Sequence, residues 1–199
     1  VGRAVVDDDD LREAARVRLG VERGERSLRV AGRGVVGGLG PGFNADRMGA
    51  DGFGQLAATM GAAYPTVVAI LGNDDPRTEE SAVLELVDAG LWIYAHQRRV
   101  EVGDLVVYGY AGVPPTPFLL KDWERYDVSR FVDPGCLSPE EGYRTVPASL
   151  VEIRYGTIDR DLQELTEGAD LSRAVMLFHA PPYQTALDRT ALDGCTVDH

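Results

Sequence analysis

The sequence predicts an α/β (α+β) fold in which mixed β-sheets are flanked by helices. Two observations carry this prediction. Strongly apolar stretches of the kind found in buried strands occur at Thr66–Leu71 and Leu171–Phe178. The stretch Thr78–Gly90 has apolar residues at helical spacing, so helices and strands alternate along the chain. Such alternation is typical of the α/β class.

The bulk composition is that of a soluble globular protein with one domain. The chain has 199 residues, of which 44% are hydrophobic and 26% charged. The formal net charge of −12 argues against nucleic-acid binding, which depends on Lys and Arg neutralising phosphates. It leaves open a small phosphate ester held by a metal, because the metal brings positive charge.

Several absences favour a cytoplasmic protein. No apolar run is long enough to span a membrane, and no signal-peptide pattern opens the chain. Cys136 and Cys195 are too few for a disulfide framework and are interpreted as reduced thiols. The sequence gives no indication of the oligomeric state.

The first 45 residues are expected to be irregular or poorly structured. The glycine-rich stretch Ala31–Phe43 contains a G-x-G-x-x-G pattern that begins at Gly32. A dinucleotide site needs a helix to start at such a pattern, and here further glycines and a proline follow. We therefore expect a flexible loop and give a Rossmann-type nucleotide site little weight.

The middle of the chain predicts two helices and four strands. A helix is expected at Asp46–Ala63, followed by the strand Thr66–Leu71. The next helix, within Thr78–Gly90, has an apolar stripe and a glycine at its natural end. Its stripe consists of Val83, Leu84 and Val87. A short strand is possible at Leu91–Tyr94, and Arg98–Val102 with Leu105–Tyr110 has the pattern of a hairpin.

The second half begins with a stiff loop. Three prolines exclude regular structure from Gly109–Phe118, and Lys121–Tyr126 is expected to continue as an exposed segment. Ser138 and Glu141 form a helix-start pattern, although Gly142 limits any helix to about one turn. A helix at Thr157–Leu165 and the strand Leu171–Phe178 complete the elements.

Polar residues directly follow the two most apolar strands. Asn73 comes after the first strand and His179 after the second. If the strands share a sheet, their side chains can meet at its C-terminal edge, where an amide oxygen and an imidazole suit Mn²⁺, Fe²⁺ or Zn²⁺. A stable site would also need carboxylates, for which Asp74, Asp75 and Asp188 are candidates. The alternative is a core histidine bonded to a backbone carbonyl.

Three blocks in order suggest a family. They are GNDDP at 72–76, GYAGVPPTPFLLKDWE at 109–124 and FHAPPYQTALD at 178–188. Together they resemble motifs of the calcineurin-like metallophosphoesterases. The resemblance implies an αββα sandwich with two divalent metal ions. It also implies that a metal-bound hydroxide attacks a small phosphate monoester or diester in line.

The resemblance also implies roles for individual residues. Asn73 and His179 match residues that bind the same metal of the pair. Asp74 stands where the family usually has a catalytic histidine. Because an aspartate is ionised at neutral pH unless its pKa is strongly raised, Asp74 is expected to orient water or a metal-bound group.

Other family motifs have no counterpart here. The early D-x-H and G-D-x-x-[DNG] motifs and the late G-H-x-H motif are missing from the sequence. We therefore expect a single metallophosphoesterase-like domain, residues 1–199, truncated at both ends, that binds a dinuclear centre poorly or not at all. The alternative is a non-catalytic binding or scaffold protein of the same fold that has lost its metals.

Overall fold

The structure is a computed structural model of the chain. It describes residues 45–183 continuously, together with residues 2–5, 17–21, 24–28, 34–38, 185, 187, 189–192 and 195–198. Side chains are described within residues 51–183 and at 185 and 187. All structural statements below concern these residues.

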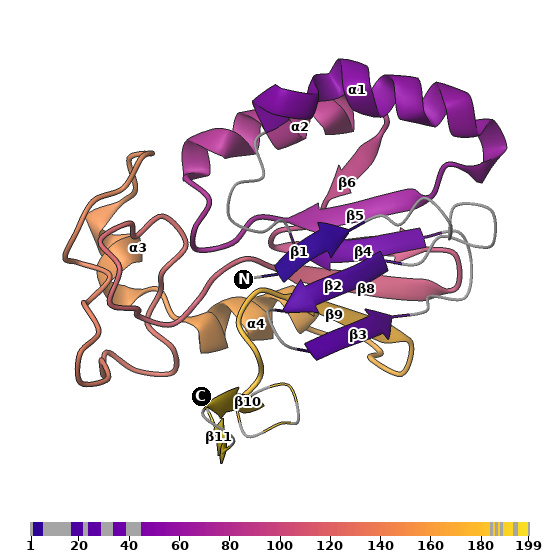
Figure 1. Ribbon diagram of the computed structural model, residues 1–199. Coiled ribbons are helices and arrows are strands. Elements are labelled where there is room, and N and C mark those ends of the chain that lie inside the picture. Colours follow the sequence, from indigo (N-terminus) through magenta and orange to yellow (C-terminus); the bar gives the residue numbers. More distant parts are fainter. Residues whose placement is uncertain are drawn as a thin grey trace.

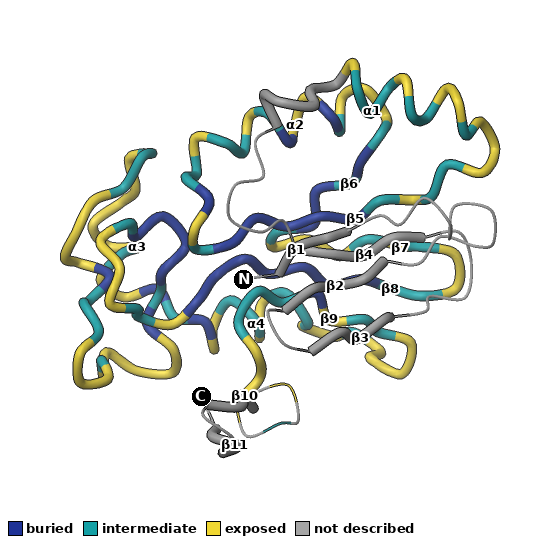
Figure 2. The backbone as a smooth tube through the Cα atoms, viewed as in Figure 1, coloured by how far each residue is buried: buried dark blue, intermediate teal, exposed yellow. Residues whose placement is uncertain are grey.

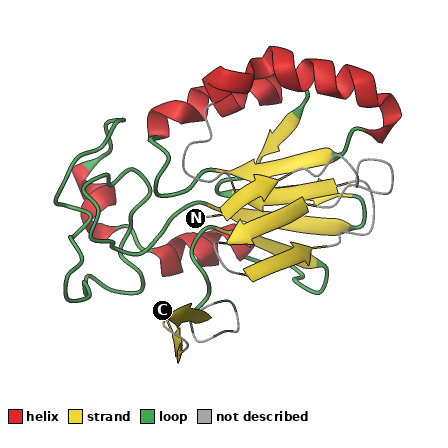
Figure 3. Ribbon diagram, in the orientation of Figure 1, coloured by secondary structure: helices red, strands yellow, loops and turns green. Residues whose placement is uncertain are grey.

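The described part of the chain contains both helices and strands, which confirms the α/β class (Figure 3). Its strands are β1 (Gly2–Val5), β2 (Val17–Val21), β3 (Gly24–Leu28), β4 (Gly34–Gly38), β5 (Thr66–Ile70), β6 (Trp92–Tyr94), β7 (Arg98–Val102), β8 (Leu105–Tyr110), β9 (Ala174–Phe178), β10 (Arg189–Leu192) and β11 (Cys195–Asp198). Its helices are α1 (Ala45–Met60), α2 (Glu80–Asp88), α3 (Leu150–Tyr155) and α4 (Ile158–Thr166), with 3₁₀ turns η2 (Gly61–Ala63) and η3 (Arg77–Glu79).

Strands β4, β5 and β6 form a parallel sheet in which chain order equals spatial order. Helix α1 connects the first pair and α2 the second. Parallel crossovers are right-handed, so two crossovers that advance in the same direction place both helices on one face. Figure 1 shows α1 and α2 together over this sheet. The opposite face is left for another layer.

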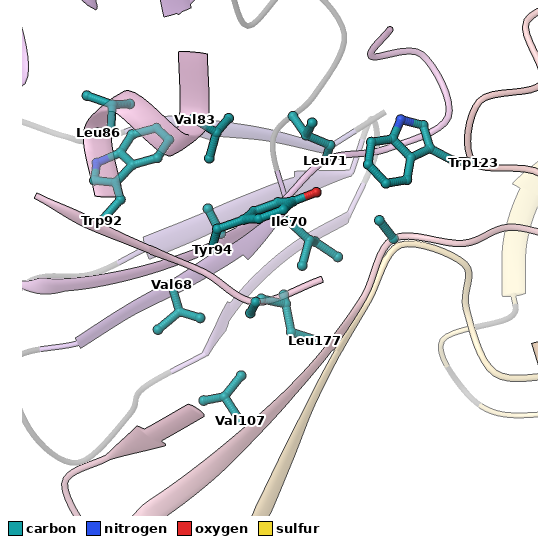
Figure 4. Close-up of a cluster of buried hydrophobic side chains, with 13 residues drawn as sticks. Val68, Ile70, Leu71, Val83, Leu86, Trp92, Tyr94, Val107, Trp123 and Leu177 are labelled. Carbon is teal, nitrogen blue, oxygen red and sulfur yellow. The ribbon is translucent and has the colours of Figure 1, made fainter. Parts of the chain in front are cut away.

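A second sheet covers that opposite face. Strand β8 pairs antiparallel with β7 and parallel with β9, and α4 lies against it on the far side (Figure 1). Val68 and Ile70 of β5 join Val107 and Leu177 from the second sheet in one core (Figure 4). Three successive β5 residues are at most 2% exposed, because helices cover one face and the second sheet the other.

Burial increases toward the carboxyl ends of the central strands. The last residues of β5, β6 and β8 are buried (Figure 2). In β5 and β8 the first two residues are more exposed than the last ones. The loops that leave these strands therefore start from fixed positions. Polar side chains placed there are held by the sheet rather than by a flexible surface segment.

Several expected elements are confirmed. Helix α1, strand β5, the β7–β8 hairpin and α4 lie where the sequence predicts them. Thr157 caps α4 by accepting a hydrogen bond from the backbone N–H of Arg160. Gly90 has a φ of 70° after α2, as its place at the helix end predicts. The Ser138–Glu141 pattern forms a turn in which the Glu141 carboxylate accepts from the Ser138 N–H.

The helix stripe needs a correction. Val83 and Leu86 are the buried residues of α2, whereas Leu84 is 38% exposed. Val87 packs against the core as expected, so Leu86 takes the place in the stripe that was expected for Leu84.

The beginning of the chain also differs from expectation. Four strands, β1–β4, lie within the region expected to be irregular. Strand β4 falls inside the glycine-rich stretch and pairs residue by residue with β5, from Gly34 opposite Thr66 to Gly38 opposite Ile70. Glycines give no side-chain pattern, so this strand is set by pairing with its neighbour rather than by local sequence.

The segment Lys121–Tyr126 is buried, not exposed as expected. Lys121 is 0% exposed, Asp122 5% and Glu124 2%. Charged side chains are rarely buried at this level without partners. Lys121 and Glu124 are paired with each other, and Asp122 accepts hydrogen bonds from the backbone N–H groups of Arg77 and Thr145. Among the described residues no helix is both long enough and apolar enough to cross a membrane. Cys136 is a free thiol, and Cys195 has no described side chain.

Candidate functional site at the strand ends

Asn73 and His179 lie in direct contact. His179 Nε2 is 2.7 Å from Asn73 Oδ1, although 106 positions separate the two residues in the chain. Asn73 follows β5 and His179 follows β9, so the contact joins the ends of the two facing sheets. The sequence suggested that these side chains could meet if their strands shared a sheet; β5 and β9 belong to different sheets, and the side chains meet nevertheless.

The backbone fixes the position of His179. Its N–H donates to the carbonyl oxygen of Tyr110 at 3.1 Å, which extends the pairing of β8 with β9 by one residue. Its ring lies against Gly72, where an added Cβ would be 2.3 Å from His179 Cε1. A glycine is therefore required at 72 for the ring to reach Asn73.

Asp75 closes the loop that carries Asn73. Its carboxylate Oδ2 accepts the Gly72 N–H at 2.8 Å, and its own N–H donates to the Gly72 carbonyl at 3.0 Å. The Trp123 indole N–H donates to the Asp75 carbonyl at 2.7 Å. Burial raises the pKa of Asp75 to about 7, against the opposing effect of the Gly72 N–H. This carboxyl group serves the turn rather than the Asn73–His179 pair.

The other candidate carboxylates are placed differently. Asp74 is exposed beside the pair, and its charge favours the protonated form of His179. Asp188 lies outside the described residues. The structure thus brings together the two expected metal ligands and leaves Asp74 as a solvent-facing neighbour.

Burial lowers the pKa of His179, so the imidazole is neutral at pH 7. A carbonyl oxygen accepts, so the 2.7 Å contact requires Nε2–H to donate to Asn73 Oδ1. Neutral imidazole is the form that binds metals. To bind a cation through Nε2, the neutral ring would have to take the other tautomer, with its proton on Nδ1 and the Nε2 lone pair free.

The pair offers two neutral donor atoms, which are fewer than a complete metal site needs. Their separation of 2.7 Å is that of a hydrogen bond. Within the described residues, no group of three or more His, Cys, Asp or Glu side chains is arranged to hold a metal.

A pocket that the sequence did not predict contains three arginines. Its volume is about 200 Å³. Its polar lining consists of Arg77, His96, Gln97, Asp122, Trp123, Glu124, Arg125, Arg144 and Glu152. The three arginines come from separate segments, so no local motif announces them. The one usable signal was the concentration of charge in KDWER, residues 121–125.

His96 forms part of the wall of this pocket. It follows β6, and its Nδ1 accepts the Ala111 N–H at 3.0 Å. Its ring meets Trp123 edge-on, with 5.0 Å between ring centroids. Burial lowers the pKa of His96 to about 3, and Arg77 adds to the effect. The ring is therefore neutral at pH 7 and acts as a hydrogen-bond acceptor.

This histidine is expected to make the fold sensitive to acid. Its pKa is lower in the folded than in the unfolded chain, so its contribution is complete above about pH 6.5 and is lost as pH falls toward 3. In His96→Asn the amide oxygen replaces Nδ1 as acceptor and does not protonate. Between about pH 7.5 and pH 4.5 the unchanged protein should lose about 2–3 kcal/mol more stability than the variant. Urea unfolding at both pH values measures this, and equal losses would contradict it.

The chain matches no known family model, no curated protein and no solved structure. Its functional interpretation therefore rests on the contact between Asn73 and His179 and on the sequence motifs that contain them.

Proposed function

We propose that the chain is a metal-dependent phosphoesterase, with Asn73 and His179 as ligands of one divalent cation such as Mn²⁺, Fe²⁺ or Zn²⁺. The observation that carries this proposal is the 2.7 Å contact between Asn73 Oδ1 and His179 Nε2 at the meeting of two strand ends. The ordered motifs that resemble calcineurin-like metallophosphoesterases, here GNDDP and FHAPPYQTALD, support it. We further propose a small phosphate ester as substrate, no nucleic-acid partner and a cytoplasmic location.

When bound, the cation would polarise a phosphoryl oxygen and stabilise negative charge in the transition state. Asn73 and His179 offer neutral donors from two rigid strand ends. Asp74 is exposed beside them and would orient water, because its carboxylate accepts but does not donate hydrogen bonds.

The proposal predicts hydrolysis of p-nitrophenyl phosphate or its bis-ester with added Mn²⁺. Asn73→Ala and His179→Ala should each lower the rate on the order of 100-fold or more, because removing a ligand costs at least as much as removing its support. Gln163→Ala is the matched control, since this exposed amide on α4 is hydrogen-bonded, within the described residues, to Asp159 of its own helix. The site assignment would be wrong if both ligand variants kept the rate of the unchanged protein.

A non-catalytic binding protein of the same fold is the second candidate. One observation favours it: the buried carboxyl group of Asp75 turns to the Gly72 N–H, so the pair gains no negatively charged ligand from its own loop. This candidate predicts that Mn²⁺ leaves the melting temperature unchanged. The enzyme proposal predicts a rise with Mn²⁺ that disappears in Asn73→Ala.

A further inference from the structure

Three arginines are among the residues that line the 200 Å³ pocket. Arg77 begins the 3₁₀ turn η3, which follows the loop after β5. Arg125 directly follows the buried residues 121–124, and Arg144 lies two residues after Gly142. Like charges held together in a half-buried space repel one another. Nearby carboxylates that are free to pair with the arginines would reduce this repulsion.

The carboxylate of Asp122 is already saturated. Its Oδ2 accepts the Arg77 backbone N–H at 2.7 Å and the Thr145 hydroxyl at 2.5 Å, and its Oδ1 accepts the Thr145 N–H at 2.8 Å. It therefore holds two backbone segments in place and is not paired with an arginine side chain in the described residues.

The carboxylate of Glu124 is also committed. Its Oε2 lies 2.6 Å from Lys121 Nζ and accepts the Thr116 N–H at 3.1 Å. Its Oε1 accepts the Thr116 hydroxyl. Lys121 neutralises this charge before any pocket arginine does.

Arg144 is the cation left without a carboxylate partner in the part of the chain that the structure describes. Its Nη2 donates only to the backbone carbonyls of Pro139 at 3.2 Å and Glu124 at 3.4 Å. Burial lowers the pKa of Arg144, and Arg125 and Arg77 act in the same direction, whereas the charges of Asp122 and Glu124 oppose the shift. The guanidinium therefore lies near two carboxylates that are hydrogen-bonded to other groups.

The other two arginines are held in defined orientations. The Arg77 guanidinium lies over the Trp123 ring at 5.1 Å, and its Nε is 3.4 Å from the Glu80 carboxylate. Arg125 pairs with Asp161, whose side chain is 9% exposed, through Nη2 at 2.9 Å and Nε at 2.5 Å. Its Nη2 is also 2.7 Å from Glu152, whose side chain is 58% exposed. An anion entering from solvent can therefore replace the partly exposed Glu80 and Glu152, whereas Asp161 keeps Arg125 in place.

We propose that this pocket binds a phosphate group, either free or as part of a small ester, between Arg77 and Arg144, with Arg125 held beside them by Asp161. Guanidinium groups offer a planar fork of donors that matches phosphate oxygens two at a time. The site needs no metal ion. It therefore stands apart from the proposed metal pair, although the segment 73–77 joins the two and Trp123 contacts Asp75 and Arg77 of that segment.

Two tryptophans provide the test. The chain has only Trp92 and Trp123, and they lie at opposite ends of the core cluster (Figure 4). Their indole N–H resonances are titrated with inorganic phosphate in the presence of EDTA, at constant ionic strength set by chloride. Saturable movement of the Trp123 resonance, with Trp92 unmoved, is the expected result. No movement, or equal movement of both, would overturn the proposal.

Substitutions separate recognition from general attraction. Arg144→Gln should weaken phosphate binding about tenfold or more, because it removes charge-assisted hydrogen bonds. Arg99→Gln removes the same charge from an exposed position on β7 and should leave binding unchanged. Arg77→Gln is the second variant, since Arg144 also contacts the turn at Pro139. Equal weakening by Arg99→Gln, or none by either pocket variant, would overturn the proposal, whatever the outcome of the metal experiments.

Discussion

Lys121→Met is expected to lower the free energy of unfolding by about 3–5 kcal/mol, because it leaves a buried carboxylate without its cation. The Lys121 and Glu124 side chains are each 1% exposed and 2.6 Å apart. The ammonium group uses all three of its donors, on Glu124 and on the carbonyls of Thr116 and Leu137. Removing it therefore strands Glu124 and releases two loop segments together. Chemical denaturation at neutral pH measures the loss.

Two comparisons define this prediction. Adding Glu124→Gln should recover part of the lost stability, because the amide keeps an acceptor for Thr116 without a buried charge. Arg160→Met breaks an exposed pair of similar length, 2.8 Å to Glu164, and should cost less than about 1 kcal/mol. If the buried and exposed substitutions cost the same, the ion pair does not stabilise the loop.

The burial of this pair explains why the sequence misled at one place. A run such as KDWERY carries four charges in six residues and is usually solvated. Here the partners of Lys121, Asp122 and Glu124 include backbone groups at 77, 116, 137 and 145. No local pattern contains those partners. The arginine pocket could not be predicted for the same reason: its residues come from separate segments that these buried charges hold together.

The strand-end pair was predictable for the opposite reason. An apolar strand followed at once by Asn or His is a local signal, and β5 and β9 each have it. The sequence also predicted the helices and the β7–β8 hairpin from periodicity and turn residues. It did not predict β4, since a strand made largely of glycine is defined by pairing with β5. Nor did it predict which sheet held each strand, because that depends on contacts far apart in the chain.

Gly72→Ala is expected to break the Asn73–His179 pair without altering either residue. The new Cβ would lie 2.3 Å from His179 Cε1, so the ring must move away. The backbone of His179 is fixed by the hydrogen bond from its N–H to the Tyr110 carbonyl, so only the side chain can move. Moving the ring breaks its 2.7 Å contact with Asn73. Overpacking of this kind costs about 1–3 kcal/mol. Loss of any Mn²⁺-dependent stabilisation should accompany the lower stability.

Gly54→Ala is the matched control because a Cβ at that position in α1 meets nothing within 4 Å. In a helix the same substitution should stabilise by about 0.5–1 kcal/mol, since alanine loses less backbone freedom than glycine on folding. The two variants are thus expected to shift stability in opposite directions. If Gly72→Ala were as stable as the unchanged protein and still bound Mn²⁺, the close approach of His179 to Gly72 would not position the ring. Contacts other than the one with Gly72 would then have to hold the His179 ring against Asn73.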